Sequence, residues 1–336
     1  MSPSLWSRMA VAVSMITSTA ALDAVALVRY VGPDGRAGAS GTSRADPAGD
    51  IQAAIDEGLQ AVRPDEALEI RVLPGTYVRQ QLVLRSSASG GGGIIIVGDG
   101  DKKHPAVFDG AGTDGPWLTV APAQAPIGNL TVSKLEIRRY ATAITLNGSR
   151  DIDALAVTDV LIRENVFRSI GQTSKSQKTP STAAVRLVNA DRVRIIDNRF
   201  VDIRNRWSCG IIHAIYVAHG STDNQVIGNT FEDSCGDAIR FRDASNNNRV
   251  EGNTFIDAWA DAPISDWYCD STSVKGCTKK TPECPSFGNI LMGNKVEIRQ
   301  AKPPNTLTAH GTDSPALCPM PAEASGASRR QRFVDQ

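Results

Sequence analysis

The chain has 336 residues, and its 36 Lys and Arg residues balance its 36 Asp and Glu residues, so the formal net charge at pH 7 is zero. A balanced charge gives no composition-based argument for binding to nucleic acid or to an anionic membrane surface, so any electrostatic role must be local. We therefore expect neither a nucleic-acid partner nor a membrane partner, and a monomeric chain.

Residues 1–24 have the features of a secretory signal peptide. A single cation, Arg8, precedes an apolar run from Met9 to Ile16, and small residues follow at positions 18–21. The run is too short for a resident membrane-spanning helix, and no later segment is more apolar. We predict cleavage before Val25 and a secreted or periplasmic location.

The next elements are a strand, a helix and further strands. Leu27 to Val31 is a run of strand formers, and residues 51–62 carry apolar side chains at helical spacing behind Asp50, a suitable N-cap. Further strands are expected at residues 69–73, 82–84, 94–97 and 132–137. A helix ahead of many strands predicts a cap, because it would cover exposed strand edges.

Two short sequence motifs then alternate between Ala143 and Val296. The first is an alanine followed by three strand formers, and it begins at Ala143, Ala184, Ala214 and Ala238. The second ends a strand with asparagine, at Asn165, Asn198, Asn229, Asn253 and Asn294. The tightest repeat, from Asn229 to Asn253, is 24 residues long. Short strands with this period cannot bury an apolar side alone, so they must stack as a solenoid.

This pattern resembles the right-handed parallel β-helix of the pectate-lyase-like superfamily over roughly residues 28 to 300. The resemblance implies an all-β solenoid whose coils contribute two or three strands each and whose corner asparagines stack. We predict the β-helix domain at residues 25–300, with an N-terminal capping helix, and a polar, poorly ordered tail at residues 301–336. The resemblance implies the fold and a polysaccharide substrate, but no particular reaction.

Three segments interrupt the repeat: residues 169–181, residues 257–288 and the tail after residue 300. All cysteines fall in the C-terminal half, at Cys209, Cys235, Cys269, Cys277, Cys284 and Cys318. An even number in an exported chain favours up to three disulfides that staple the C-terminal loop region. A zinc site is the competing interpretation, but no C-x-x-C spacing supports it.

Alignment of the two tightest coils pairs residues 24 positions apart: His213 with Asp237, Tyr216 with Arg240, and His219 with Asp243. One coil earlier, Arg186 falls in the column of Tyr216 and Arg240. Partners in a parallel stack lie about 4.7 to 4.9 Å apart, so these side chains should form a row on one outer surface. Such a row suits an acidic polysaccharide, because guanidinium groups bind carboxylates and aromatic rings pack on sugar faces.

A uronate polymer can be cleaved by β-elimination when its carboxylate is neutralised, a base removes the C5 proton and an acid protonates the leaving oxygen. We assign catalysis to His213, Tyr216 and Arg240: His213 or Tyr216 as base, the other as acid, and Arg240 with Arg186 as neutralising group. The substrate-binding candidates are Arg186, Arg242, Asp237, Asp243, His219 and Trp267. No motif indicates a metal ligand, which leaves a calcium requirement open.

Other interpretations account for the same residues. His213 could be a turn residue bonded to Asp237, and Arg240 and Arg242 could be strand-face charges paired with acidic neighbours. A glycoside hydrolase would pair Asp237 with Asp243 or Asp266. A non-catalytic glycan-binding protein is a third possibility, because a fold does not determine a function. The segment from Gly236 to Asp243 is loosely similar to the Glu-x-Ile-Arg-Ile-Gly region of alginate and chondroitin lyases.

Overall fold

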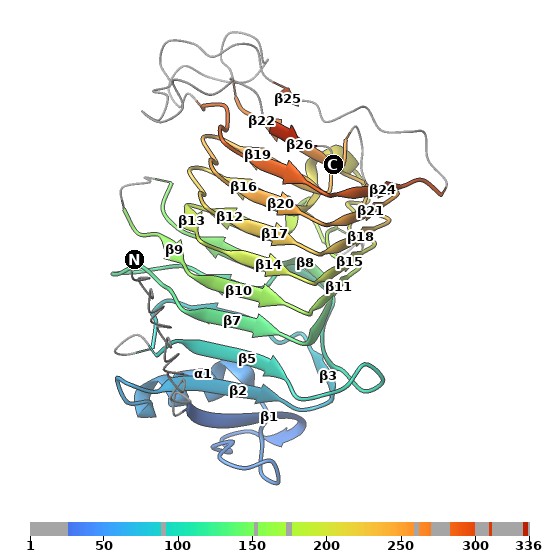
Figure 1. Cartoon of the computed structure of the whole chain (residues 1–336). Coiled ribbons are helices and arrows are strands. Elements are labelled where there is room, and N and C mark those ends of the chain that lie inside the picture. Colours follow the sequence, from blue (N-terminus) through green and yellow to red (C-terminus); the bar gives the residue numbers. More distant parts are fainter. Residues whose placement is uncertain are drawn as a thin grey trace, which may run out of the picture.

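The computed structural model describes residues 26–88, 92–150, 154–172, 177–258, 262–269 and 283–299, and the backbone of residues 309–310 and 332–334. The predicted signal peptide, residues 1–24, lies outside these residues. The strands stack side by side along one axis and pair in parallel, which confirms the predicted right-handed parallel β-helix (Figure 1). Each turn of the chain buries its apolar side against the turns above and below it.

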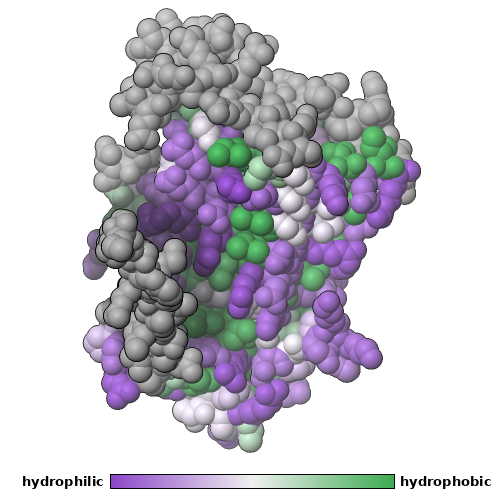
Figure 2. Space-filling view, viewed as in Figure 1, coloured by the Kyte–Doolittle hydropathy of each residue, from purple (hydrophilic) through white to green (hydrophobic). Residues whose placement is uncertain are grey.

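The first face of the solenoid is a 10-stranded sheet. Its strands, in spatial order, are β1 (Ala26–Arg36), β2 (Ala67–Val72), β5 (Ile94–Gly98), β7 (Leu130–Ser133), β10 (Val160–Arg163), β14 (Arg194–Ile196), β17 (Gln225–Ile227), β20 (Arg249–Glu251), β23 (Ile290–Met292) and β26 (Arg332–Val334). Its outer surface mixes hydrophilic and hydrophobic side chains (Figure 2).

The second and third faces belong to one 14-stranded sheet, because the long strands β6 (Ala106–Val120) and β8 (Leu135–Asn147) run through both. The second face also holds β3 (Gly75–Val78), β11 (Val166–Arg168), β15 (Arg199–Val201), β18 (Thr230–Glu232), β21 (Thr254–Ile256) and β24 (Lys295–Glu297). The third face also holds β4 (Leu82–Leu84), β12 (Ala183–Val188), β16 (His213–Ala218), β19 (Ile239–Arg242), β22 (Ile264–Trp267) and β25 (Ala309–His310). A separate pair joins β9 (Val157–Thr158) to β13 (Ala190–Asp191).

The predicted capping helix is present as α1 (Ile51–Ala61), beside β1 and β2 at the N-terminal end of the solenoid (Figure 1). The Asp50 carboxylate accepts a hydrogen bond of 2.8 Å from the Ala53 amide, as expected of an N-cap. The helix buries Ile51, Ala54, Ile55 and Gly58. Among the described residues, no helix has the length and apolar character that crossing a membrane requires.

The predicted asparagine column lies at the corner between the first and second faces. From Asn198 to Asn294, the side-chain oxygen of each asparagine accepts hydrogen bonds from the backbone amide and the side-chain amide of the asparagine one coil earlier. Each side-chain amide also donates to a backbone carbonyl, as Asn229 does to Ile195 at 2.8 Å. Inside this corner, four phenylalanine rings stack with centroids 4.8 to 4.9 Å apart. The structural role predicted for these asparagines is confirmed.

Replacing Asn229 with alanine is expected to destabilise the protein by at least about 1 to 3 kcal/mol, because it leaves buried backbone groups without partners. The change should appear as a lower denaturant midpoint in equilibrium unfolding. The neighbouring outward residue Thr230 is the matched control, and Thr230→Ala should shift stability by no more than about 0.5 kcal/mol. An unchanged midpoint for Asn229→Ala would contradict the structural role of the ladder.

Three features differ from the sequence-based expectation or extend it. A second, shorter ladder of Asn224, Asn248 and Asn289 occupies the corner between the third and first faces. The strand expected over residues 132–137 is two strands, because Lys134 has a φ of +57° and turns the corner between β7 and β8. The segment expected as one interruption over residues 257–288 contains β22, which continues the third face.

The cysteines that the structure describes are all in disulfides. Cys209 is bonded to Cys235, and Cys269 and Cys284, in the C-terminal region, are disulfide-bonded as well. Cys277 and Cys318 lie outside the described residues. Most of the tail predicted at residues 301–336 also lies outside them, although β25 and β26 pair with β22 and β23.

Candidate functional site

The third face brings the predicted site residues into one outward column. Its register pairs Arg186 with Tyr216 and Tyr216 with Arg240, as the repeat spacing predicted. The column continues to Thr145 on β8 at one end and to Ser265 on β22 at the other. Parallel pairing in register places these side chains next to one another although they are far apart in sequence.

A groove of about 410 Å³ opens on the Thr145 side of this column. Its floor includes Thr142 and Thr145 of β8 and Arg186 of β12, and residues 114–116 of β6 contribute one edge. Residues 179–182, which lead into β12, line it as well. Hydrogen bonds fix this segment, since the hydroxyl groups of Ser181 and Thr142 are 2.9 Å apart.

Two polar groups in the groove lack the partners that burial normally requires. Arg186 donates a hydrogen bond of 3.1 Å to the side-chain oxygen of Asn147, and no carboxylate of the described residues pairs with it. The pKa of the Arg186 guanidinium is lowered, chiefly by burial. The Thr145 hydroxyl is buried without any hydrogen-bond partner in the described part of the chain. A bound anion would satisfy both groups.

Arg240, the next cation in the column, is in a buried ion pair. Its Nη2 donates to the Asp237 carboxylate at 2.7 Å, and its Nε donates to the Ser265 hydroxyl at 2.6 Å. The Ser265 hydroxyl donates to the same Asp237 oxygen at 2.7 Å, and Asp237 is only 2% exposed. The structure therefore places Arg240 against Asp237 and Ser265, and its guanidinium is less available to a substrate than that of Arg186.

Arg242 links the column to the segment that follows residue 282. Its guanidinium donates two hydrogen bonds, of 2.7 and 2.6 Å, to the Glu283 carboxylate. A third hydrogen bond, of 3.0 Å, goes from Nη1 to the Tyr216 hydroxyl. The guanidinium also lies over the Trp267 ring, 4.4 Å from its centroid. Trp267 therefore packs within the protein on Arg242, as part of the support for Tyr216.

His213 is buried beside Tyr216. The two rings are nearly parallel, with centroids 5.8 Å apart, and His213 is only 3% exposed. The Nδ1 atom is 2.8 Å from the backbone carbonyl of Asp237, so Nδ1 carries the proton and donates. Burial, and secondarily the charge of Arg240, lowers the pKa of His213 to about 3. At neutral pH the imidazole is uncharged.

The low pKa of His213 predicts acid lability. The unfolded histidine takes up a proton below its ordinary pKa of about 6.5, whereas the folded one resists until about pH 3. The contribution of uncharged His213 to the free energy of unfolding is therefore fully present above pH 6.5 and is lost as the pH falls toward 3. Unfolding free energies measured from pH 7 to pH 4 should fall more steeply for the natural protein than for His213→Gln. Parallel curves would contradict this role.

Buried His219 and half-buried Asp243 form another pair, at the end of the third face. His219 Nδ1 is 2.8 Å from an Asp243 oxygen, and the other oxygen accepts a hydrogen bond from the Cys284 amide. With Glu283 they form a group whose ligand atoms all lie within 4.8 Å of one another, a geometry that could hold a metal ion. Glu283 is already bound by Arg242, so an ion would have to displace a guanidinium.

Asp266 lies in register with the core residue Phe241, on the inward side of β22. Both of its oxygens accept hydrogen bonds from Ser286, and burial raises its pKa to about 6. Asp237 points into the outer ion pair with Arg240. Of the two pairings that the hydrolase interpretation offers, the one between Asp237 and Asp266 would therefore join carboxylates on opposite sides of the strand layer.

The groove itself was not predicted from the sequence. Its wall at residues 179–182 belongs to an insertion with no repeat, and Thr145 carried no signal beyond its place in the column. The sequence could have indicated Thr145 only through the register that placed it before Arg186.

Comparisons with known proteins show a similarity of fold. No protein-family model matches the chain, and no curated protein matches it. Among solved structures, pectate lyase Pel9A is 11% identical with a TM-score of 0.45, and the match covers 86% of this chain and 81% of that one. Pectate lyase Bsp165PelA from Bacillus sp. N165, in complex with trigalacturonate, is 18% identical with a TM-score of 0.44, with 87% and 88% covered.

The catalytic domain of a GH87 α-1,3-glucanase is 14% identical with a TM-score of 0.49, and the match covers 74% of this chain but 43% of that one. At these identities the similarity concerns the fold alone.

Proposed function

We propose that this protein is a secreted carbohydrate-active enzyme, a polysaccharide lyase that cleaves a uronate-containing polymer by β-elimination. The observation that carries the proposal is the Arg186 guanidinium, which lies in an open groove without a carboxylate partner among the described residues. A half-buried cation beside an unpartnered Thr145 hydroxyl favours an anionic ligand. A uronate carboxylate supplies the negative charge, and the open groove accommodates a chain of sugars.

Arg186 takes the role of the neutralising group in this mechanism. When the Arg186 guanidinium pairs with the uronate carboxylate, it neutralises the carboxylate charge. The C5 proton is then easier to remove. Arg240, which is engaged by Asp237, holds the floor of the site in place. From the sequence, Arg240 and Arg186 shared the role of neutralising group. In this mechanism Arg186 neutralises the carboxylate and Arg240 has a structural role.

Tyr216 is the better of the two candidates for proton transfer. The low pKa of His213 makes its imidazole a weak base, and an uncharged imidazole whose proton is held by the Asp237 carbonyl is a poor acid. Tyr216 Oη accepts a hydrogen bond of 3.0 Å from Arg242, and Arg186 is the register neighbour of Tyr216 on the preceding coil. His213 supports the Tyr216 ring from one side.

The proposed step balances without a further reactant. The Tyr216 oxygen, as phenolate, takes the proton from C5, and the electron pair of that bond forms the C4–C5 double bond. The bond from C4 to the glycosidic oxygen breaks, and that oxygen takes up the proton from Tyr216. One product has a new non-reducing end with an unsaturated uronate, and the other has a new reducing end.

Two other functions remain as rivals of the lyase. A glycoside hydrolase would need two carboxylates across one substrate, as Asp237 with Asp243 or Asp266, and a binding protein would use the same groove without chemistry. The purified protein, incubated with polygalacturonate, alginate and hyaluronate, distinguishes them. A lyase produces both ultraviolet absorbance from unsaturated ends and new reducing ends, a hydrolase produces only the second, and a binder neither. Absence of absorbance on every polymer would reject the lyase proposal.

The remaining proposals concern the whole chain. We propose export after cleavage of residues 1–24, a β-helix domain over residues 25–300 and a monomeric enzyme. Intact mass of the secreted protein, measured with and without reductant and alkylating agent, tests the export proposal. A chain that retains residues 1–24 would contradict it.

A further inference from the structure

Trp207 is an exposed aromatic side chain that the proposed mechanism does not use. Its side chain lies in the loop between β15 and β16 and is 62% exposed, and it is the one aromatic among the large exposed hydrophobic residues of the described chain. Water contact with so large an apolar ring is unfavourable, so an exposed tryptophan on a well-anchored loop is a candidate contact for a ligand.

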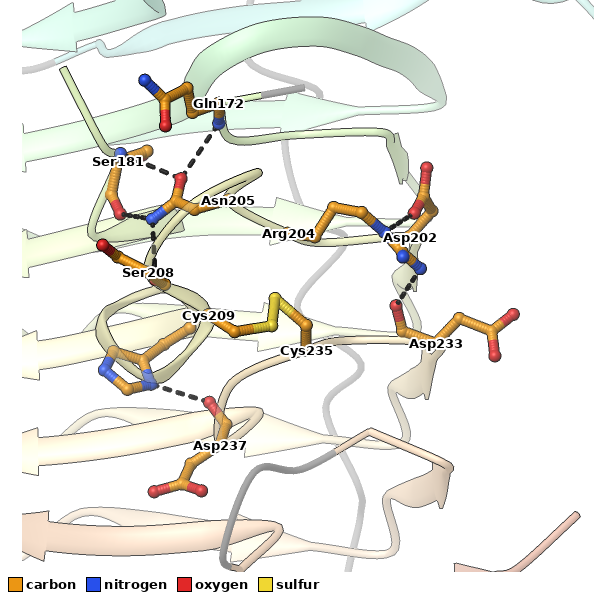
Figure 3. Close-up of a disulfide and its surroundings, with 11 residues drawn as sticks. Gln172, Ser181, Asp202, Arg204, Asn205, Ser208, Cys209, Asp233, Cys235 and Asp237 are labelled. Carbon is orange, nitrogen blue, oxygen red and sulfur yellow. Dashed lines mark hydrogen bonds and ion pairs between the residues drawn. A yellow bond between two sulfur atoms is a disulfide. The ribbon is translucent and has the colours of Figure 1, made fainter. Parts of the chain in front are cut away.

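The loop that carries Trp207 is anchored at several points (Figure 3). Cys209, two residues further on, is bonded to Cys235 on the next coil. On the other side, the Asn205 oxygen accepts hydrogen bonds of 3.0 Å from the amides of Gln172 and Ser181. The Arg206 amide donates to the Gln172 carbonyl at 2.8 Å. A loop held in this way loses little conformational entropy when a ligand packs on its side chains.

The backbone next to Trp207 is strained. Ser208 has a φ of +123°, a region that residues other than glycine rarely adopt. Ser208 lies between the exposed ring and Cys209, and its carbonyl accepts a weak hydrogen bond from the Asn205 amide. The surrounding bonds therefore hold a strained loop in which the indole faces solvent.

The neighbours of the ring indicate which ligand it would take. The Arg206 guanidinium lies over the indole, with its central carbon 4.8 Å from the ring centroid, and has no acidic partner among the described residues. The guanidinium therefore covers part of one face of the indole, and the 62% exposure of Trp207 leaves apolar ring surface next to a positive charge. Ser181, which is hydrogen-bonded to Asn205 in the base of the loop, also lines the Arg186 groove.

We propose that Trp207 and Arg206 form a second sugar-binding subsite, which takes a pyranose ring with a carboxylate from the same polymer that occupies the groove. The indole packs against the apolar face of the sugar, and the guanidinium pairs with the carboxylate. The subsite adds affinity for a long chain, because one molecule reaches both the groove and the loop. The identity of the polymer, though not the subsite, rests on the proposed function.

Affinity electrophoresis of the full chain in gels that contain polygalacturonate or alginate tests the subsite without requiring turnover. Trp207→Ala should weaken retardation by about tenfold in apparent affinity, which corresponds to about 1.4 kcal/mol. Trp207→Phe should restore most of the binding, because it keeps an aromatic face. Val78→Ala is the matched control, since Val78 is 59% exposed on β3, and it should bind as the natural protein does.

Three results would overturn the subsite: equal retardation of Trp207→Ala and the natural protein, a loss that Trp207→Phe fails to restore, or a dimer that Trp207→Ala dissociates. The last would show that a second copy covers the ring. Where cleavage is observed, the KM of Trp207→Ala should rise more for an octasaccharide than for a trisaccharide. Retardation that depends on Trp207 without any cleavage would reject the lyase and keep the subsite.

Discussion

Arg186→Ala is expected to lower turnover on the polymer that the substrate panel identifies by roughly 100-fold or more, because it removes the charge that stabilises the reacting carboxylate. Its melting temperature should stay close to that of the natural protein, since Arg186 has one side-chain hydrogen bond, to the exposed Asn147. Initial rates from absorbance of unsaturated ends and thermal melts measure the two quantities independently.

Two further variants make the Arg186 experiment specific. Arg186→Lys should recover only part of the activity, because an ammonium group cannot bind a carboxylate at two points. Arg194→Ala is the matched control, since Arg194 is an exposed arginine on β14 of the first face, and it should keep full turnover. Tyr216→Phe should be as slow as Arg186→Ala. Activity that survives in both Arg186→Ala and Tyr216→Phe would place the reaction elsewhere.

Arg240→Ala is expected to destabilise the fold by about 3 to 5 kcal/mol, because it leaves the Asp237 carboxylate buried without its positive partner. An outward arginine on an exposed strand face would be expected to contribute little to stability. The ion pair reverses that expectation: the Arg240 side chain is 16% exposed and that of Asp237 only 2%. Equilibrium unfolding in denaturant measures the difference.

A double-mutant cycle separates the ion pair from other effects. In the Asp237→Ala background, Arg240→Ala should lower the free energy of unfolding by much less than it does in the natural protein. The reason is that no buried carboxylate charge remains. The control pair is Arg249 with Glu251 on β20, whose side chains are 43% and 32% exposed. Arg249→Ala should change stability by no more than about 1 kcal/mol. Equal losses for Arg240→Ala and Arg249→Ala would refute the buried role of Arg240.

The coil repeat was predictable because the same two sequence motifs recur along the chain, although inserted loops change the length of the coils. Asn229 and Asn253 are 24 residues apart, and each occupies the same corner in its own coil. The second ladder has the same spacing between Asn224 and Asn248, yet it was missed, because no strand motif of the repeat ended on those residues. The break at Lys134 was also missed, since a positive φ at a lysine leaves no trace in the apolar pattern.

The candidate site was predicted only as a set of neighbours. Equal coil lengths place Tyr216 beside Arg240 in any parallel stack, so sequence spacing was sufficient for that pairing. The choice of hydrogen-bond partners was not predictable in this way. Glu283 reaches Arg242 from 41 residues away, and it lies in a segment without the repeat. That contact determines which arginine remains available for an anion.

The sequence by itself therefore determined the architecture, the corner ladder and the column that holds Arg186, Tyr216 and Arg240, because a periodic pattern converts spacing along the chain into adjacency in space. The tertiary structure alone decided that Arg240 is paired with Asp237, that Arg186 lies in an open groove and that Trp207 is exposed on a loop anchored by a disulfide. Those outcomes depend on loops of irregular length, whose contacts follow from packing and charge rather than from any repeat.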